Sequence, residues 1–158
     1  MTVQRLYLCA EHIYFGHFGR PAGRAPMEQV ERAQVVAGRG LVGDRFFARP
    51  ADHPGQVTFF AEETWAQLSA ELGRSDLGPE VFRRNVLVRG IDLLSLIGRE
   101  FEVQGVRFLG TEHCKPCFWM DEAFAPGALA KLSAWNAGGL RARALSDGWL
   151  AAMEAGRS

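Results

Sequence analysis

The amino-acid sequence predicts a mainly β domain with a barrel-like sheet and two or so short flanking α-helices. Short apolar or alternating segments recur along the chain, separated by Gly and Pro, which is typical of a small barrel or a curled antiparallel sheet. Only two segments place apolar residues at helical spacing. Regular alternation of strands with long helices is missing, as is a Gly-x-Gly-x-x-Gly motif, so a doubly wound dinucleotide-binding fold is not expected.

Strands are expected where apolar residues run together or alternate with polar ones. Three apolar runs predict strands: "VQRLYLC" (3–9), "QVTFF" (56–60) and "RNVLV" (84–88). "REFEVQGVRFLG" (99–110) alternates and reverses near Gln104-Gly105, which predicts a hairpin with one buried face. "LRARAL" (140–145) also alternates and predicts a strand.

Two helices and one long loop are expected between these strands. Residues 61–72 carry apolar side chains on one helical face and acidic side chains in the first turn, and Gly73 follows as a stop. Residues 127–135 repeat the helical spacing and are followed by Gly138-Gly139. Residues 16–27 are rich in Gly and Pro and predict a loop.

Composition limits the classes of protein to which the chain can belong. Its 158 residues suit one domain (1–158), and 18 acidic against 18 basic side chains argue against nucleic acid as a partner. Three cysteines make no disulfide framework and favour a reducing compartment. The N-terminus lacks the order of a signal peptide, and no apolar run approaches the ~20 residues that span a bilayer. We therefore expect a cytoplasmic protein without a membrane partner.

Cys114 and Cys117 lie three apart in "GTEHCKPCFWMD" (110–121) and suggest several chemistries. Structural zinc needs four ligands, and beyond this pair there are only Cys9 and four scattered histidines. The pattern is that of a thiol–disulfide couple, but such a motif normally follows the first strand of a βαβ unit. Either thiol also suits a small buried hydrophobe. The residues alone leave these alternatives open.

An ordered set of motifs around the cysteines resembles the MOSC family, found at the C-terminus of molybdenum cofactor sulfurases and as small stand-alone bacterial proteins. The resemblance covers roughly residues 35–150. Its motifs are, in order, Gly43-Asp44-Arg45, Arg84-Asn85, Gly90-Ile91-Asp92-Leu93, Leu96-x-Gly98, Cys114-x-Pro116-Cys117, Gly138-Gly139 and Asp147-Gly148. One departure is Phe46, which stands where relatives often have His.

The resemblance implies a β-barrel domain that binds the molybdenum cofactor, a molybdopterin with a dithiolene and a terminal phosphate. A cysteine thiolate then ligates molybdenum or carries sulfur as a persulfide, and thiolate is a suitably soft ligand. The implied catalytic residues are Cys117 and Cys114, with Cys117 the molybdenum ligand. The expected cofactor-binding residues are Asp44, Arg45, Arg84, Asn85 and His113.

Two arguments about the cysteines conflict. Neighbouring His113 and Lys115 are groups that lower a thiol pKa, which favours Cys114 as the reactive sulfur. The resemblance places the ligand at Cys117, and Pro116 fixes the backbone just before it. We expect Cys117 to be the ligand, because a metal deprotonates its thiol in any case.

The resemblance implies a molybdenum-dependent oxidoreductase that reduces N-hydroxylated compounds, or a sulfur or cofactor carrier. Small-molecule substrate and cofactor are the expected ligands, with an electron-donor or sulfur-donor protein as a possible partner. Pyridoxal phosphate is not expected, because it belongs to a separate desulfurase domain that this chain is too short to contain. The alternative is a thiol–disulfide redox protein that uses Cys114 and Cys117 without metal.

Overall fold

The computed structural model describes residues 1–10, 27–47, 49–51 and 53–153, which form two β-sheets and three α-helices. The larger sheet has seven strands in the order β2-β1-β6-β5-β9-β8-β7. These are β1 (Thr2–Leu8), β2 (Glu28–Val30), β5 (Val57–Ala61), β6 (Val86–Arg89), β7 (Glu100–Val103), β8 (Val106–His113) and β9 (Leu140–Ala144). The smaller sheet has the order β10-β3-β4, with β3 (Arg32–Val36), β4 (Gly40–Leu41) and β10 (Gly148–Ala151). The mainly β prediction is confirmed, but the sheets are not closed into a barrel.

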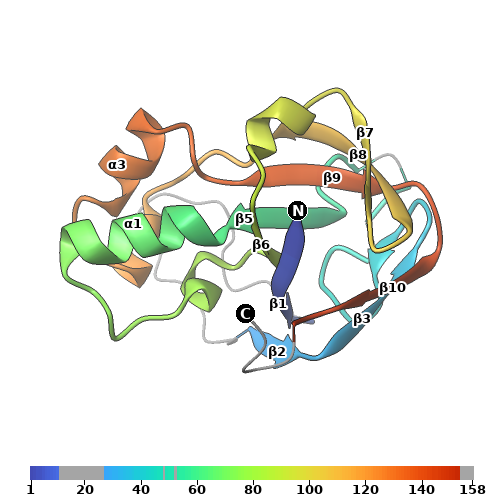
Figure 1. Cartoon of the computed structure of the whole chain (residues 1–158), viewed down its shortest axis with the longest axis horizontal. Helices are drawn as coiled ribbons and strands as arrows, with labels where there is room; N and C mark the ends of the chain where they lie inside the picture. The colour runs from blue at the N-terminus through green and yellow to red at the C-terminus, as the bar shows by residue number, and fades with distance from the viewer. Residues whose placement is uncertain (11–26, 48, 52, 154–158) are drawn as a thin grey trace.

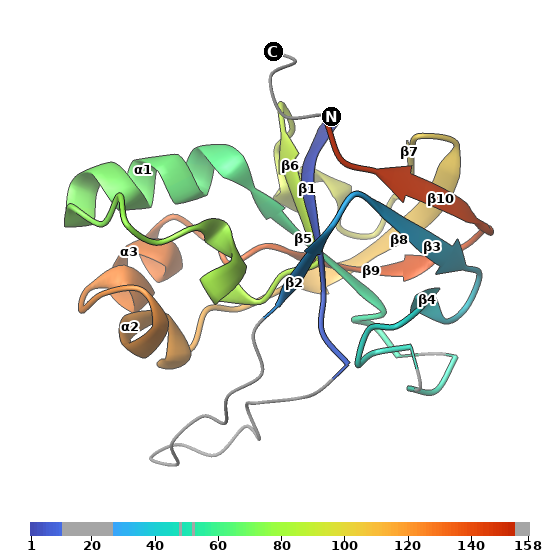
Figure 2. The ribbon, with the colours of Figure 1, turned by 90° about the horizontal axis from the view of Figure 1, so that it is seen from below.

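The helices gather at one end of the molecule, opposite the small sheet (Figure 1). The view from below shows the same separation (Figure 2). The two expected helices are present as α1 (Glu62–Leu72), which ends at Gly73 with φ 64°, and α3 (Ala128–Ala134). A third, α2 (Trp119–Ala123), follows the cysteines and was not predicted. Two short 3-10 helices, η1 (Pro79–Phe82) and η2 (Leu93–Leu96), complete the helical elements.

One strand pair departs from the expected antiparallel sheet. β5 and β6 run parallel, because α1 carries the chain from the end of one back to the start of the other. The other named pairs are antiparallel. The β7–β8 hairpin is confirmed. Gln104 (φ 52°) and Gly105 (φ 82°) form its turn, and a type I′ hairpin turn requires a positive φ at both of these positions. The predicted loop at 16–27 lies outside the described residues, except for Met27.

β5 is buried on both faces, although its Thr58 is polar. Its side chains alternate between two cores, so both faces of the strand are buried. Phe59 points to the core between the sheets and packs edge-on against Phe108, with ring centroids 5.4 Å apart. Phe60 points to the core under the helices and packs on Phe82 at 5.0 Å. β5 therefore joins the sheet to the helical end, and its neighbour β9 pairs with β8, which the two pocket cysteines follow.

A buried glutamine connects the two sheets. Gln56 is 1% exposed, and its Nε2 donates to the carbonyls of Gly38 (3.0 Å) and Ala51 (2.7 Å). Its Oε1 accepts the N–H of Ala144 in β9 at 3.0 Å. Gly38 lies in the turn between β3 and β4, so one side chain bonds to both sheets.

No helix among the described residues is long and apolar enough to cross a membrane.

Candidate functional site

A cavity of about 280 Å³ opens beside Cys117, and we call it the cysteine pocket. Both Cys114 and Cys117 line it, together with the aromatic side chains of Phe46 and Trp119. The described lining includes no acidic side chain. Its charged residues are five basic ones, namely Arg45, Arg83, Arg84, Lys115 and Arg141. A chain with no net charge thus concentrates positive charge around its thiols.

The cysteine segment is held in place by the residues directly before β9. The N–H of Cys114, directly after β8, donates to the carbonyl of Gly139 at 2.8 Å. Gly138 lies against the same segment so closely that an added Cβ would overlap the Cys114 carbonyl oxygen and crowd Pro116. The expected Gly138-Gly139 pair therefore permits a close backbone approach.

The two thiols differ in exposure. Both are free, but Cys114 is only 5% exposed, whereas Cys117 is partly exposed to the pocket. The carbonyl of Cys117 accepts the N–H of Met120 at 3.0 Å, and α2 begins in between. Phe118 is thus the N-cap of this short helix, and Trp119 and Met120 form its first turn, with Met120 buried and Trp119 in the pocket wall.

Arg84 is fixed by backbone carbonyls. Its Nε donates to Gly138 at 3.0 Å and its Nη1 to Phe82 at 2.8 Å. Carbonyl acceptors hold the guanidinium without neutralising its charge. Arg84 therefore presents a positioned positive charge to the pocket.

Arg45 also lines the pocket and is held by the residues around it. Its Nη2 donates to the carbonyl of Arg83 at 3.0 Å, and its Nη1 lies 3.3 Å from the Asp44 carboxylate. Its guanidinium carbon lies 4.6 Å from the centre of the Phe46 ring. Burial lowers the pKa of Arg45, and the Asp44 carboxylate opposes that shift. Phe46, which stands where relatives often have His, thus packs against the arginine.

Asp44 and Asn85 lie behind the pocket wall, and neither lines the cavity. The Asp44 carboxylate is buried and accepts hydrogen bonds from the N–H groups of Cys9 (3.1 Å) and Phe46 (3.2 Å) and from Asn85 Nδ2 (3.1 Å). Asn85 is fully buried, and its Oδ1 accepts from the N–H (3.1 Å) and hydroxyl (3.0 Å) of Thr58. These two residues organise the wall from which Arg45 and Thr58 face the cavity.

His113 also lies outside the lining. Its Nε2 accepts the N–H of Gly138 at 3.1 Å, which places the proton of the neutral ring on Nδ1. Burial, and then the charges of Arg84 and Lys115, lower the pKa of His113. A neutral imidazole adds no positive charge to the neighbouring thiols, so its contribution is to hold the Gly138 loop.

Arg141 is a pocket residue that sequence reasoning missed. It lies in β9, and its Nη1 donates to Glu112 in β8 at 2.9 Å. Burial lowers the pKa of Arg141, but the charge and hydrogen bond of Cys114, together with Glu112, outweigh burial and raise it. The alternation of "LRARAL" placed Arg141 on the face opposite the core, but only the pairing of β9 with β8 puts that face beside the cysteines.

His53 is another pocket residue that was not expected from the sequence. Its Nδ1 accepts the N–H of Gly55 at 3.1 Å, and its ring stacks on Phe46 with centroids 5.7 Å apart. Among the described residues, no three His, Cys, Asp or Glu side chains gather in a way that would hold a metal ion.

The family model of the MOSC domain matches residues 48–156. The fold is similar to that of the YuaD protein from Bacillus subtilis, with a TM-score of 0.69 and 19% identity over 94% of this chain and 90% of that one. It is also similar to YiiM from Escherichia coli (TM-score 0.60, 15% identity, 94% and 66% covered) and to YiiM from Geobacillus stearothermophilus (TM-score 0.66, 12% identity, 95% and 70% covered). No curated protein sequence matches the chain.

Proposed function

Because this chain belongs to the MOSC domain family, we propose that its cysteine pocket binds the molybdenum cofactor and that Cys117 provides the thiolate ligand to molybdenum. The observation that carries the proposal is a partly exposed thiol in a cavity lined by five basic side chains and, among the described residues, no acidic one. A thiolate is a soft ligand that suits molybdenum, and the basic side chains suit an anionic pterin phosphate.

The donor set of the pocket fits both ends of such a cofactor. Arg84 and Arg45 are anchored by backbone carbonyls, so their remaining N–H groups are positioned for an anion. Arg141 reaches the same cavity from β9. Trp119 and Phe46 add apolar walls to the cavity that holds the thiol. Asp44 and Asn85 support this arrangement from behind, through hydrogen bonds to the wall.

The proposed reaction is the two-electron reduction of N-hydroxylated compounds. The bound cofactor supplies the redox centre. Cys117 would hold the metal and the arginines would hold the anionic part of the cofactor, so the protein's part is to bind and orient the cofactor. Electrons come from a separate donor protein. A sulfur carrier with a persulfide on Cys117 would use the same thiol, and a turnover assay separates the two.

A thiol–disulfide protein is the second candidate, because Cys114 and Cys117 are both free and line the same cavity. It requires both sulfurs and no metal. The metal-dependent proposal requires Cys117 and leaves Cys114, which is more deeply buried and faces Arg141, in a supporting position.

Metal analysis of two serine variants tests the proposal. The protein is expressed in a molybdate-fed host that makes the cofactor, and molybdenum and oxidised-pterin fluorescence are measured per chain. We expect about one equivalent in the wild type, almost none in Cys117→Ser and most of it in Cys114→Ser, because only one sulfur is the ligand. Circular dichroism checks that both variants fold.

The other outcomes have definite meanings. Molybdenum absent from the wild type in repeated preparations would contradict the proposal and favour the thiol–disulfide candidate. Loss from Cys114→Ser alone would show that the other sulfur is the ligand. With the loaded protein, reduction of an amidoxime by a reduced artificial donor supports the enzyme, and retention without turnover supports a carrier.

A further inference from the structure

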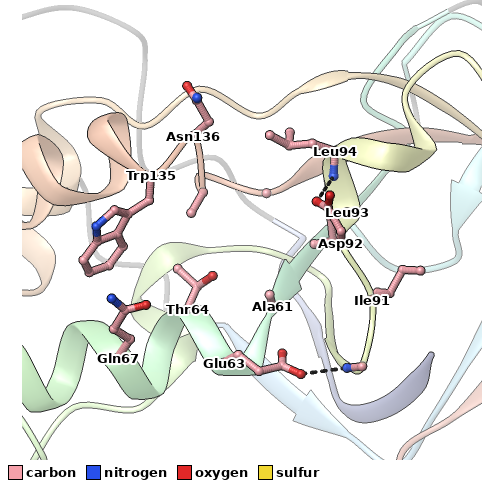
Figure 3. A pocket seen from close by; sticks show the side chains of 13 residues that line it. Ala61, Glu63, Thr64, Gln67, Ile91, Asp92, Leu93, Leu94, Trp135 and Asn136 are labelled. Atoms are coloured by element: carbon pink, nitrogen blue, oxygen red, sulfur yellow. Dashed lines mark hydrogen bonds between the residues drawn. The ribbon is translucent and has the colours of Figure 1, made fainter.

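A second cavity lies between α1, the turn after β6 and the loop that joins α3 to β9 (Figure 3). Its volume is about 560 Å³, within the range of small-molecule sites. It shares no lining residue with the cysteine pocket. We call it the Trp135 groove, and the lining residues that matter here are Glu63, Thr64, Asp92, Leu94, Trp135 and Gly139.

The charged residues that line the Trp135 groove have the opposite sign to those of the cysteine pocket. Its charged lining residues are Glu63 and Asp92, and its described lining includes no Lys or Arg. Figure 3 shows Trp135 at one end, above Gln67, and Asp92 at the other. The groove thus combines an aromatic surface with two carboxylates, which disfavours a phosphate or a carboxylate as its ligand.

The two carboxylates are fixed by the backbone. Glu63 Oε1 accepts the N–H of Gly90 at 2.7 Å and ties the turn after β6 to α1. Asp92 Oδ1 accepts the N–H of Leu94 at 3.1 Å and caps η2. Each carboxylate has a second oxygen that accepts no hydrogen bond from a described residue. The acceptors are therefore positioned before any ligand arrives.

A cation already lies near the aromatic end, and its charge is balanced. Lys131 Nζ lies 5.9 Å from the centre of the Trp135 ring and forms an ion pair with Glu71 at 2.7 Å. Indole rings attract cations through the negative charge of their faces. The ring therefore suits a cationic ligand, while Lys131 stays paired outside the lining.

We propose that the Trp135 groove binds a planar organic cation with N–H donors, such as an aryl amidine. Its ring packs against Trp135, and its N–H groups donate to the second oxygens of Glu63 and Asp92. The site is separate from the proposed cofactor pocket and does not depend on it. The two are neighbours, however, because Gly139 lines the groove while its carbonyl accepts the N–H of Cys114.

The test uses benzamidine and benzoate, which share a planar ring and differ in charge. Each is titrated into uniformly ¹⁵N-labelled protein, and backbone amide shifts are followed. We expect benzamidine to shift the amides of Ile91, Leu94 and Gly139 in a saturable way, because these residues line the groove. Benzoate should leave these amides unchanged and act, if anywhere, on residues of the basic cysteine pocket.

Isosteric variants test the two carboxylates. Glu63→Gln keeps an acceptor for the Gly90 N–H, and Asp92→Asn keeps a cap for η2, so the walls stay in place. Combining the two should weaken benzamidine binding about tenfold, because the neutral amides leave the cation without a negative partner in the groove. Glu122→Gln, an exposed acidic residue outside the groove, is the matched control and should bind as the wild type does.

Three results would overturn the proposal: no saturable shift at the groove amides, equal shifts with benzoate, or unchanged affinity in the double variant. Should the double variant fail to fold, Glu63→Gln alone and the comparison of the two probes decide the question.

Discussion

Asp44 organises a pocket that it does not line. Its buried carboxylate accepts bonds from two backbone N–H groups, from Asn85 and from Arg45, which faces the cavity. A buried carboxylate is tolerated only when it has an ion-pair partner and enough hydrogen-bond donors around it. The direction in which Arg45 points therefore depends on a residue one position earlier in the chain.

Replacing Asp44 with Ala should lower the free energy of unfolding by about 3–5 kcal/mol, because it leaves Arg45 buried without its partner. Chemical denaturation of the cofactor-free protein measures the loss. Asp76→Ala is the control, since Asp76 pairs with Arg74 at the exposed surface, and it should change stability little. Equal losses in the two variants would show that Asp44 is not the organising residue.

The sequence indicated several of the residues that meet in the pocket, but not all of them. Arg45, Arg84, Cys114 and Cys117 line one cavity, and their roles toward a cofactor stay predictions. Asn85 was expected to bind the cofactor, which stays a prediction, and in the structure its amide is engaged in hydrogen bonds behind the wall. A sequence motif does not reveal which side of a wall a side chain occupies, because that depends on partners such as Thr58, 27 residues away.

At the level of elements, the loop that leads from α3 into β9 makes close contacts with the cysteine pocket. Gly138 donates to His113, accepts from Arg84 and lies against the cysteine segment. The geometry of the pocket therefore depends on a position with no side chain.

Gly138→Ala should destabilise the protein by about 1–3 kcal/mol and lower the retained molybdenum, because the new methyl group overlaps the Cys114 carbonyl. Thermal unfolding and metal analysis measure the two effects. Gly98→Ala is the control. Its φ of 76° strains an Ala by roughly 1–2 kcal/mol, but its Cβ would meet open space. A similar loss of molybdenum in both variants would mean that the effect follows general stability and not the contact with the cysteine segment.

Local patterns were enough to predict most strands and the two longer helices. The hairpin at 99–110 and the helix at 61–72 have complete signals within their own residues, and both were confirmed. α2 was missed because five residues carry too little periodicity. The parallel pairing of β5 with β6 was missed because pairing is a property of the chain path and leaves no mark within either strand.

For the whole molecule, Gln56 is one of the connections between the two sheets. Gln56→Leu should lower the free energy of unfolding by roughly 3 kcal/mol, because each buried group left without a partner costs about 1–3 kcal/mol. Denaturant titration measures this loss. Gln104→Leu is the matched control, since its amide bonds to the Ala151 backbone lie at the surface, where water replaces them. A loss as large in the control would show that burial of Gln56 is not the cause.

The net charge of zero does not show how charges are distributed over the folded molecule. Equal numbers of acidic and basic residues argued against nucleic acid as a partner, yet five basic side chains meet in one cavity and two acidic ones in another. The basic residues come from segments as far apart as Arg45 and Arg141, so no window of the sequence contains the cluster. Composition cannot reveal a separation of charge that only folding creates.

The pairing of β10 with β3 also affects the order in which the two sheets form during folding. Ala33 pairs with Leu150, and the two are synthesised far apart. Until β10 leaves the ribosome, β3 has only the two residues of β4 as a neighbour and exposes a free edge to other chains. Contacts between distant segments form slowly. We therefore expect the small sheet to assemble last, and the interval before it closes to be when the nascent protein is most prone to aggregate.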